Sequence, residues 1–192
     1  MPTAYHFELS LISRSNGSIY LAKHDDLESG KNPTERDDGN HAFTKFWKDH
    51  LVALTNPGLY DLVVDSLVAL ALGEHNWPKS KTTNQINKWR NSMRTLLKDN
   101  PPNLVIVRDV PKSEAGYFGI HYRQSYLWKF ICINESYINA WSASTKELDL
   151  VSYATLLDAA IDHELGHWIV TLASSIPWYQ ILIFSSYINK KC

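Results

Sequence analysis

Two histidines and a glutamate have the types and the spacing that suit metal-assisted hydrolysis. The sequence His163-Glu164-Leu165-Gly166-His167 has the form H-E-x-x-H. On a helix, residues four apart point to the same side, so two neutral imidazoles can bind one Zn²⁺. Glu164 then lies beside the metal, where it can take a proton from zinc-bound water and pass it to the leaving amine. The pattern predicts zinc ligands at His163 and His167 and a general base at Glu164 for peptide hydrolysis.

The motif requires a helix, and the sequence around it predicts one. Ser152 is a suitable N-cap, and residues 153–168 follow it with apolar positions at helical spacing. These positions are Leu156, Leu157, Ala160, Ile161 and Trp168. The alternative is a solvated helix with two surface histidines. The apolar surroundings disfavour it, because uncompensated polar groups in such a stretch are costly.

Three helices and three short strands are expected before the motif. The segments with apolar residues at helical spacing are residues 42–54, 59–72 and 83–98. After Asn100-Pro101-Pro102 the pattern changes to short runs of β-branched and aromatic residues. These runs predict strands at residues 104–107, 116–122 and 128–134. Helices, then strands, then the motif helix indicate an α+β fold.

The first 41 residues are expected to hold little regular structure. Residues 5–22 alternate loosely around a Ser-Asn-Gly-Ser turn, which predicts a hairpin or a poorly ordered arm. Residues 23–41 are charged and interrupted by Gly and Pro, which predicts an exposed loop. His24 with Asp25 and Asp26 is interpreted as part of that solvated loop rather than as a ligand cluster.

Length and composition indicate one globular domain over residues 1–192. Hydrophobic residues make up 44% and charged residues 20%, and two cysteines form no disulfide framework. A net charge of -1 gives no electrostatic reason to expect nucleic acid or an anionic membrane as partner. No apolar run is long enough to span a membrane, and the first residues do not have the pattern of a signal peptide. The expected location is intracellular and cytoplasmic.

Residues 103–174 resemble the zincin metallopeptidases. The resemblance is carried by a strand at residues 129–134 and by the helix with the H-E-L-G-H form of the motif. It implies a zincin-like α+β fold, in which a small mixed sheet places its edge strand over a long H-E-x-x-H helix. It also implies that Phe130–Asn134 binds an extended peptide or protein substrate by β-augmentation. Under this resemblance His163 and His167 are zinc ligands and Glu164 is the general base.

A catalytic zinc of this kind takes a third protein ligand. The metzincin pattern needs Gly at position 170 and His at position 173, where this chain has Val170 and Ala173. Downstream of the motif there is no Glu, Asp or His, and Cys192 is the one soft ligand. Residues 178–192 form an atypical tail that is rich in Ile, Phe, Tyr, Asn and Lys. We therefore expect that the natural reading frame diverges near Pro177 and that the segment with the third ligand is missing.

Five further residues are candidates for supporting roles. His121 is a candidate third ligand or oxyanion donor, and Tyr122 and Tyr126 are candidates for similar roles. Asp158 and Asp162 flank the motif and are candidates for orienting an imidazole through its second nitrogen. A purely structural or surface role is the alternative for each of them.

Three functions remain open from the sequence. The first is a zinc metallopeptidase in which Glu164 activates zinc-bound water. The second is a catalytically inactive zincin-fold module that binds peptides or proteins and lacks the third zinc ligand. The third is a helical interaction domain in which the motif occurs by chance.

Overall fold

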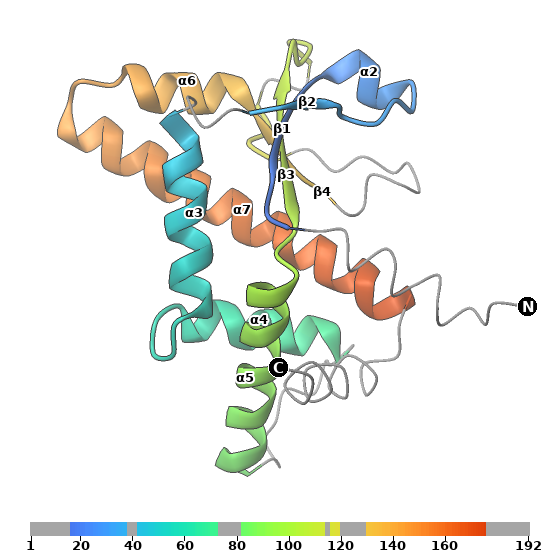
Figure 1. Cartoon of the computed structure of the whole chain (residues 1–192). Coiled ribbons are helices and arrows are strands. Elements are labelled where there is room, and N and C mark those ends of the chain that lie inside the picture. Colours follow the sequence, from blue (N-terminus) through green and yellow to red (C-terminus); the bar gives the residue numbers. More distant parts are fainter. Residues whose placement is uncertain (1–15, 38–41, 73–81, 114–115, 120–129, 176–192) are drawn as a thin grey trace, which may run out of the picture. The chain divides into compact units, whose positions relative to one another are not determined.

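The computed structural model describes residues 16–37, 42–72, 82–113, 116–119 and 130–175. Within them the chain has six helices and a mixed sheet of four strands, so the expected α+β class is confirmed (Figure 1). The strands are β1 (Ile19–Lys23), β2 (Glu35–Arg36), β3 (Asn103–Arg108) and β4 (Phe130–Asn134). The helices are α2 (His24–Glu28), α3 (Ala42–Thr55), α4 (Asp61–Ala71), α5 (Thr83–Asp99), α6 (Glu135–Ala143) and α7 (Glu147–Ser175). The sheet contradicts the third function, an almost purely helical domain.

The sheet is built around β3. Its strand order is β2-β1-β3-β4, and β3 pairs in parallel with both β1 and β4, whereas β2 is antiparallel to β1. Ile106 lies opposite Leu21 on one side and Ile133 on the other. Successive residues of β3 and β4 are buried on both faces of the sheet. Parallel strands that are covered on both faces have continuous apolar sequences, which is why these two strands were predictable.

The N-terminal region is more ordered than the sequence predicts. Residues 1–15 lie outside the described residues, but the second half of the expected hairpin or arm forms β1, whose partners are β2 and β3. The exposed loop expected at residues 23–41 is wrong where its described part forms α2 and β2, whereas residues 29–34 between them belong to no helix or strand. Leu27 of α2 is fully buried in a cluster with Val105, Val107 and Cys132, and this burial holds the short helix against the sheet.

The solvated position expected for His24 is also wrong. His24 is only 5% exposed, and it is the first residue of α2. Asp26 instead accepts a hydrogen bond from Lys31 at 2.7 Å.

The three helices predicted between residues 42 and 98 are confirmed as α3, α4 and α5. The side chain of Thr82 caps α5 by accepting a hydrogen bond from the Gln85 N–H at 3.3 Å. Arg90 of α5 donates two hydrogen bonds to Asp65 of α4, at 2.6 and 2.5 Å. Charge-assisted bidentate contacts of this kind fix the two helices against each other.

Two features near the motif differ from the sequence prediction. The strand β4 is followed by α6 before the motif helix begins, and Asn134 caps α6 by accepting from the Ser136 N–H at 3.0 Å. The motif helix α7 begins at Glu147, so Ser152 is not its N-cap. The Ser152 hydroxyl donates to the Leu148 carbonyl at 2.8 Å, which lets a serine sit inside a helix.

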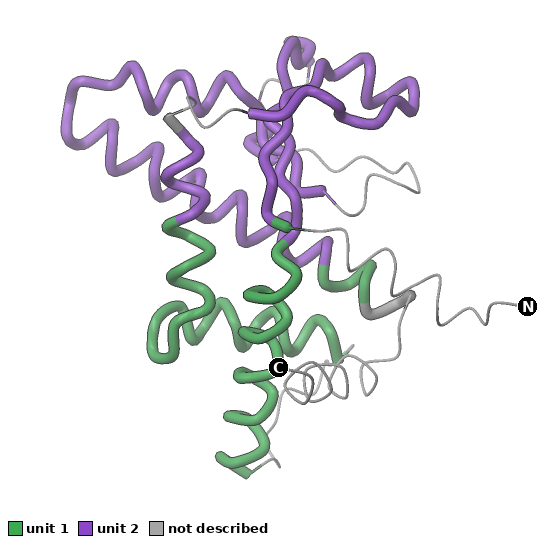
Figure 2. The backbone as a smooth tube through the Cα atoms, viewed as in Figure 1, with its two compact units in different colours: residues 1–16, 49–101, 169–192 green, residues 17–48, 102–168 purple. Residues whose placement is uncertain are grey.

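The chain divides into two compact units (Figure 2). One unit contains residues 17–48 and 102–168, and therefore the whole sheet and the H-E-x-x-H motif. The other contains residues 49–101 and 169–192, with the residues that precede Gly17. The single domain expected from composition stays a prediction. None of the described helices has an apolar stretch long enough to cross a membrane.

We expect Ile106→Ala to lower the free energy of unfolding by about 2–5 kcal/mol, because it leaves a cavity in the central strand. Ile106 is fully buried between its two neighbouring strands. The matched control is Leu148→Ala, since Leu148 is 77% exposed on α7 and its truncation should change stability by less than about 0.5 kcal/mol. Urea denaturation followed by circular dichroism measures both, and equal losses would contradict the buried position of Ile106.

Candidate functional site

The motif lies on α7 where a buried face meets an exposed one. Leu157, Ile161, Leu165 and Trp168 recur at helical spacing and are at most 4% exposed. The neighbouring face carries Leu156, Ala159, Ala160, His163 and His167, which line a pocket. At 100° per residue, Glu164 falls between these two faces. The helix therefore presents two imidazoles to the pocket and holds the carboxyl group largely out of water.

The two imidazoles converge. The Nε2 atoms of His163 and His167 are 3.1 Å apart, and the rings lie at 85° with centroids 4.7 Å apart. Two nitrogens of a tetrahedral zinc site lie about 3.3 Å apart when each Zn–N bond is about 2.0–2.1 Å. The two rings thus already have the separation that a shared zinc ion needs.

Glu164 completes a group of three candidate metal ligands. One ligand atom from each of His163, Glu164 and His167 lies within 4.8 Å of the others. Glu164 is 5% exposed, and burial raises its pKa from 4.5 to about 7. A carboxyl group with a pKa near neutrality is suited to taking and returning a proton at physiological pH. A nearby cation would favour its charged form and lower that pKa.

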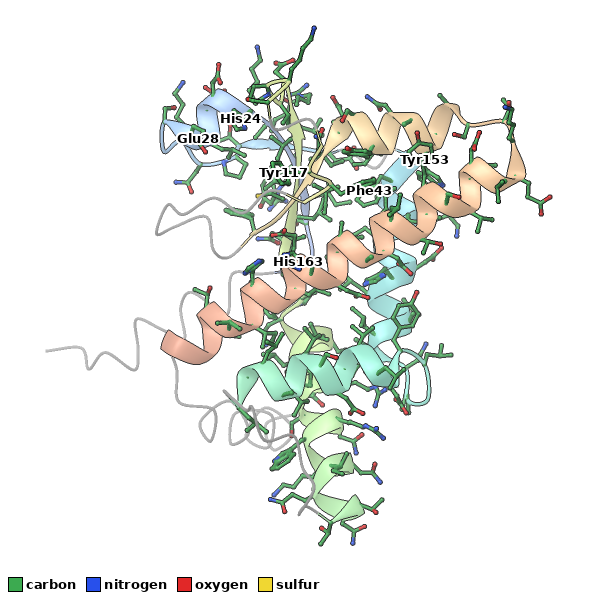
Figure 3. All side chains as sticks on the ribbon, turned by 180° about the vertical axis from the view of Figure 1, so that it is seen from behind. His24, Glu28, Phe43, Tyr117, Tyr153 and His163 are labelled. Atoms are coloured by element: carbon green, nitrogen blue, oxygen red, sulfur yellow. The ribbon has the colours of Figure 1, made fainter. Side chains whose placement is uncertain are left out.

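A pocket of about 410 Å³ opens over this group. One side is α7, from Leu156 to His167, and the other side is the segment at residues 116–119. Figure 3 labels His163 on α7 and Tyr117 in the segment across from it. The volume is within the range of small-molecule and peptide side-chain sites. Its α7 side is apolar at Leu156, Ala159 and Ala160 and polar at the motif.

The 116–119 segment runs antiparallel to the outer side of β4. Gly119 forms an isolated bridge with Ile133, and the Asn134 N–H donates to the Phe118 carbonyl at 2.9 Å. The strand expected at residues 116–122 is thus reduced to one bridge in its described part, and residues 120–122 lie outside it. The predicted peptide path along Phe130–Asn134 is already occupied by the chain's own backbone at Ile133 and Asn134.

The sequence predicted supporting roles for six further residues. His121, Tyr122, Tyr126 and Cys192 lie outside the described residues. Asp158 and Asp162 are partly exposed on α7, and their role in orienting an imidazole stays a prediction.

Cys132 of β4 is buried, and its thiol pKa is raised, first by burial and then by the charge of Glu164. A buried thiol of this kind is a poor nucleophile and a poor metal ligand.

Comparison with family models, curated proteins and solved structures finds no match to this chain. The chemistry of the site has to be inferred from its own side chains.

Two residues shape the site in ways that the sequence analysis did not predict, although Asn134 was part of the predicted substrate edge. Asn134 holds the 116–119 segment, and Gly119 lies directly against the Glu164 side chain. A glycine inside a strand-like pattern often marks a close backbone approach, so Gly119 carried a usable signal. Asn134 carried one as well, because asparagine is among the preferred N-cap residues.

The raised pKa of Glu164 predicts that the metal-free protein loses stability as pH rises. Below pH 4.5 the carboxyl group is protonated in both states, and between pH 4.5 and 7 the unfolded chain releases the proton first. Glu164→Gln removes this titration. We expect the stability of the variant relative to the natural chain to rise by about 2–3 kcal/mol between pH 5 and pH 8. Urea denaturation with a chelator present measures it, and a constant difference would contradict the burial of Glu164.

Proposed function

We propose that this chain is a zincin-type zinc metallopeptidase domain, in which His163 and His167 hold zinc and Glu164 is the general base. The observation that supports it most directly is the 3.1 Å approach of the two Nε2 atoms beside a buried carboxyl group. In the metal-free chain one ring nitrogen can donate a proton to the other. A cation would take the place of that shared proton and bind both lone pairs.

Each part of the proposed site has a separate role in hydrolysis. Zinc, when bound, supplies Lewis-acid polarisation of the peptide carbonyl and acidifies water near it. Glu164 accepts the proton of the attacking water and returns it to the leaving amine, for which its burial beside the pocket is suited. The pocket between α7 and the 116–119 segment holds the peptide. The further donors offered by the sequence, His121 and Cys192, lie outside the described residues.

We expect the purified chain to contain about one zinc ion per molecule and His163→Ala to contain almost none, because one imidazole alone cannot retain the metal. Elemental analysis after dialysis against a weak chelator measures both. His50→Ala is the matched control, since His50 is a buried histidine on α3 and not a member of the motif. Equal zinc in all three proteins, or none in the natural chain, would contradict the zinc assignment.

We expect Glu164→Gln to keep zinc and to lower the hydrolysis of a quenched fluorescent peptide library by at least about 100-fold. Glutamine has nearly the same shape as glutamate but cannot accept the proton. Zinc content and the cleavage rate are measured on the same preparation. Cleavage at the natural rate in this variant would exclude Glu164 as the base.

A catalytically inactive module that binds peptides is the second candidate. It is favoured by the position of Glu164 within 4.8 Å of both histidines, because a carboxylate that ligates the metal is no longer available as a base. The same variant separates the two functions. Loss of zinc in Glu164→Gln, with no cleavage by the natural chain, indicates the binding module, whereas retained zinc with lost cleavage indicates the enzyme.

A further inference from the structure

The Glu164 side chain lies against the backbone of Gly119. A Cβ atom built on Gly119 would be 2.5 Å from Glu164 Oε1 and 2.8 Å from its Cγ, and real Cβ atoms do not approach other atoms so closely. Gly119 is not among the described residues with positive φ, so its backbone conformation is open to any residue. Close approach, and not backbone freedom, is what requires glycine here.

The backbone that carries Gly119 is fixed by its neighbours. Asn134 is 1% exposed and donates from its side-chain Nδ2 to the Tyr117 carbonyl at 3.2 Å. Its backbone N–H donates to the Phe118 carbonyl at 2.9 Å. The Phe118 ring stacks on Tyr137 of α6, with centroids 3.5 Å apart and planes at 20°. The segment is thus tied to β4 and to α6 immediately before it meets Glu164.

We propose that Gly119 is a positioning residue that fixes the Glu164 carboxyl group at the floor of the pocket, a role whose catalytic consequence rests on the proposed function. The Glu164 side chain lies against the backbone wall at Gly119, and its carboxyl group is within 4.8 Å of a ring nitrogen of each motif histidine. Asn134 supports this wall through its two hydrogen bonds. The carboxyl group therefore stays in one place without having to be a metal ligand.

We expect Gly119→Ala to displace the Glu164 side chain rather than the 116–119 segment. The added methyl group overlaps the end of the Glu164 side chain, so either the segment or the side chain has to move. The segment is held by two hydrogen bonds and a ring stack, whereas the glutamate can rotate about its side-chain bonds. The Glu164 side chain is therefore expected to move, and it moves into the pocket, which it lines.

Carbodiimide labelling of carboxyl groups, followed by peptide mass spectrometry, tests this movement in the metal-free protein. In the natural chain Glu164 is 5% exposed and should label slowly. Gly119→Ala should raise its labelling rate at least fivefold. The matched control is Gly116→Ala in the same segment, where a Cβ would meet no heavy atom within 4 Å, and its labelling rate should stay within twofold of the natural chain. Equal labelling of Glu164 in all three proteins overturns the proposal.

If the natural chain cleaves peptides, steady-state kinetics give a second test of the positioning role of Gly119. Gly119→Ala should lower kcat by about 100-fold and leave KM within about twofold, because a displacement of about 1 Å at a reacting group costs that much in rate. An unchanged kcat overturns the positioning role. A natural chain that cleaves nothing refutes the proposed function, and the labelling experiment then still decides the proposal on Gly119.

A double variant controls for misfolding. Glu164→Ala removes the atoms that the new methyl group would meet, so Gly119→Ala should leave the urea midpoint of Glu164→Ala unchanged. A further loss of stability in the double variant would show that glycine is needed at position 119 for another contact, and would overturn the proposal.

Discussion

A carboxyl group held out of water is the constraint around which this site is arranged. Glu164 lies between the buried and exposed faces of α7, and its side chain lies against the backbone at Gly119. Burial of a carboxyl group disfavours its charge, which is why the pKa of Glu164 rises to about 7. The same burial keeps the group beside two imidazoles rather than in solvent.

The sheet contributes to the site indirectly. Its strands β3 and β4 are buried on both faces, and neither lines the pocket. What β4 provides is a fixed outer edge, on which Asn134 and Ile133 hold the 116–119 segment. Asn134 also begins α6, so a single side chain joins a helix start to the wall of the pocket.

The sequence predicted the parts of the molecule that depend on periodicity. The three helices between residues 42 and 98 and the helix of the motif follow from the spacing of apolar residues, whereas β3 and β4 follow from continuous runs of β-branched and aromatic residues. The start of α7 was misplaced because serine is a strong N-cap residue, yet Ser152 satisfies its hydroxyl within the helix. The order of α2 depends on its two buried residues, His24 and Leu27, and on a sheet formed by distant strands. Local sequence carries little information about such contacts, and the same holds for Gly119 and Glu164, which are 45 residues apart.

Metal binding and the burial of Glu164 should support each other. A cation between His163 and His167 lowers the free energy of the charged carboxylate, and so offsets the penalty that burial imposes above neutral pH. A metal that binds only the folded state also stabilises that state in proportion to its affinity. Folding, the proton on Glu164 and the metal are then one linked equilibrium. In the proposed site, the backbone at Gly119 would hold the carboxyl group near a metal bound by the two histidines, whose ligand atoms lie within 4.8 Å of its own.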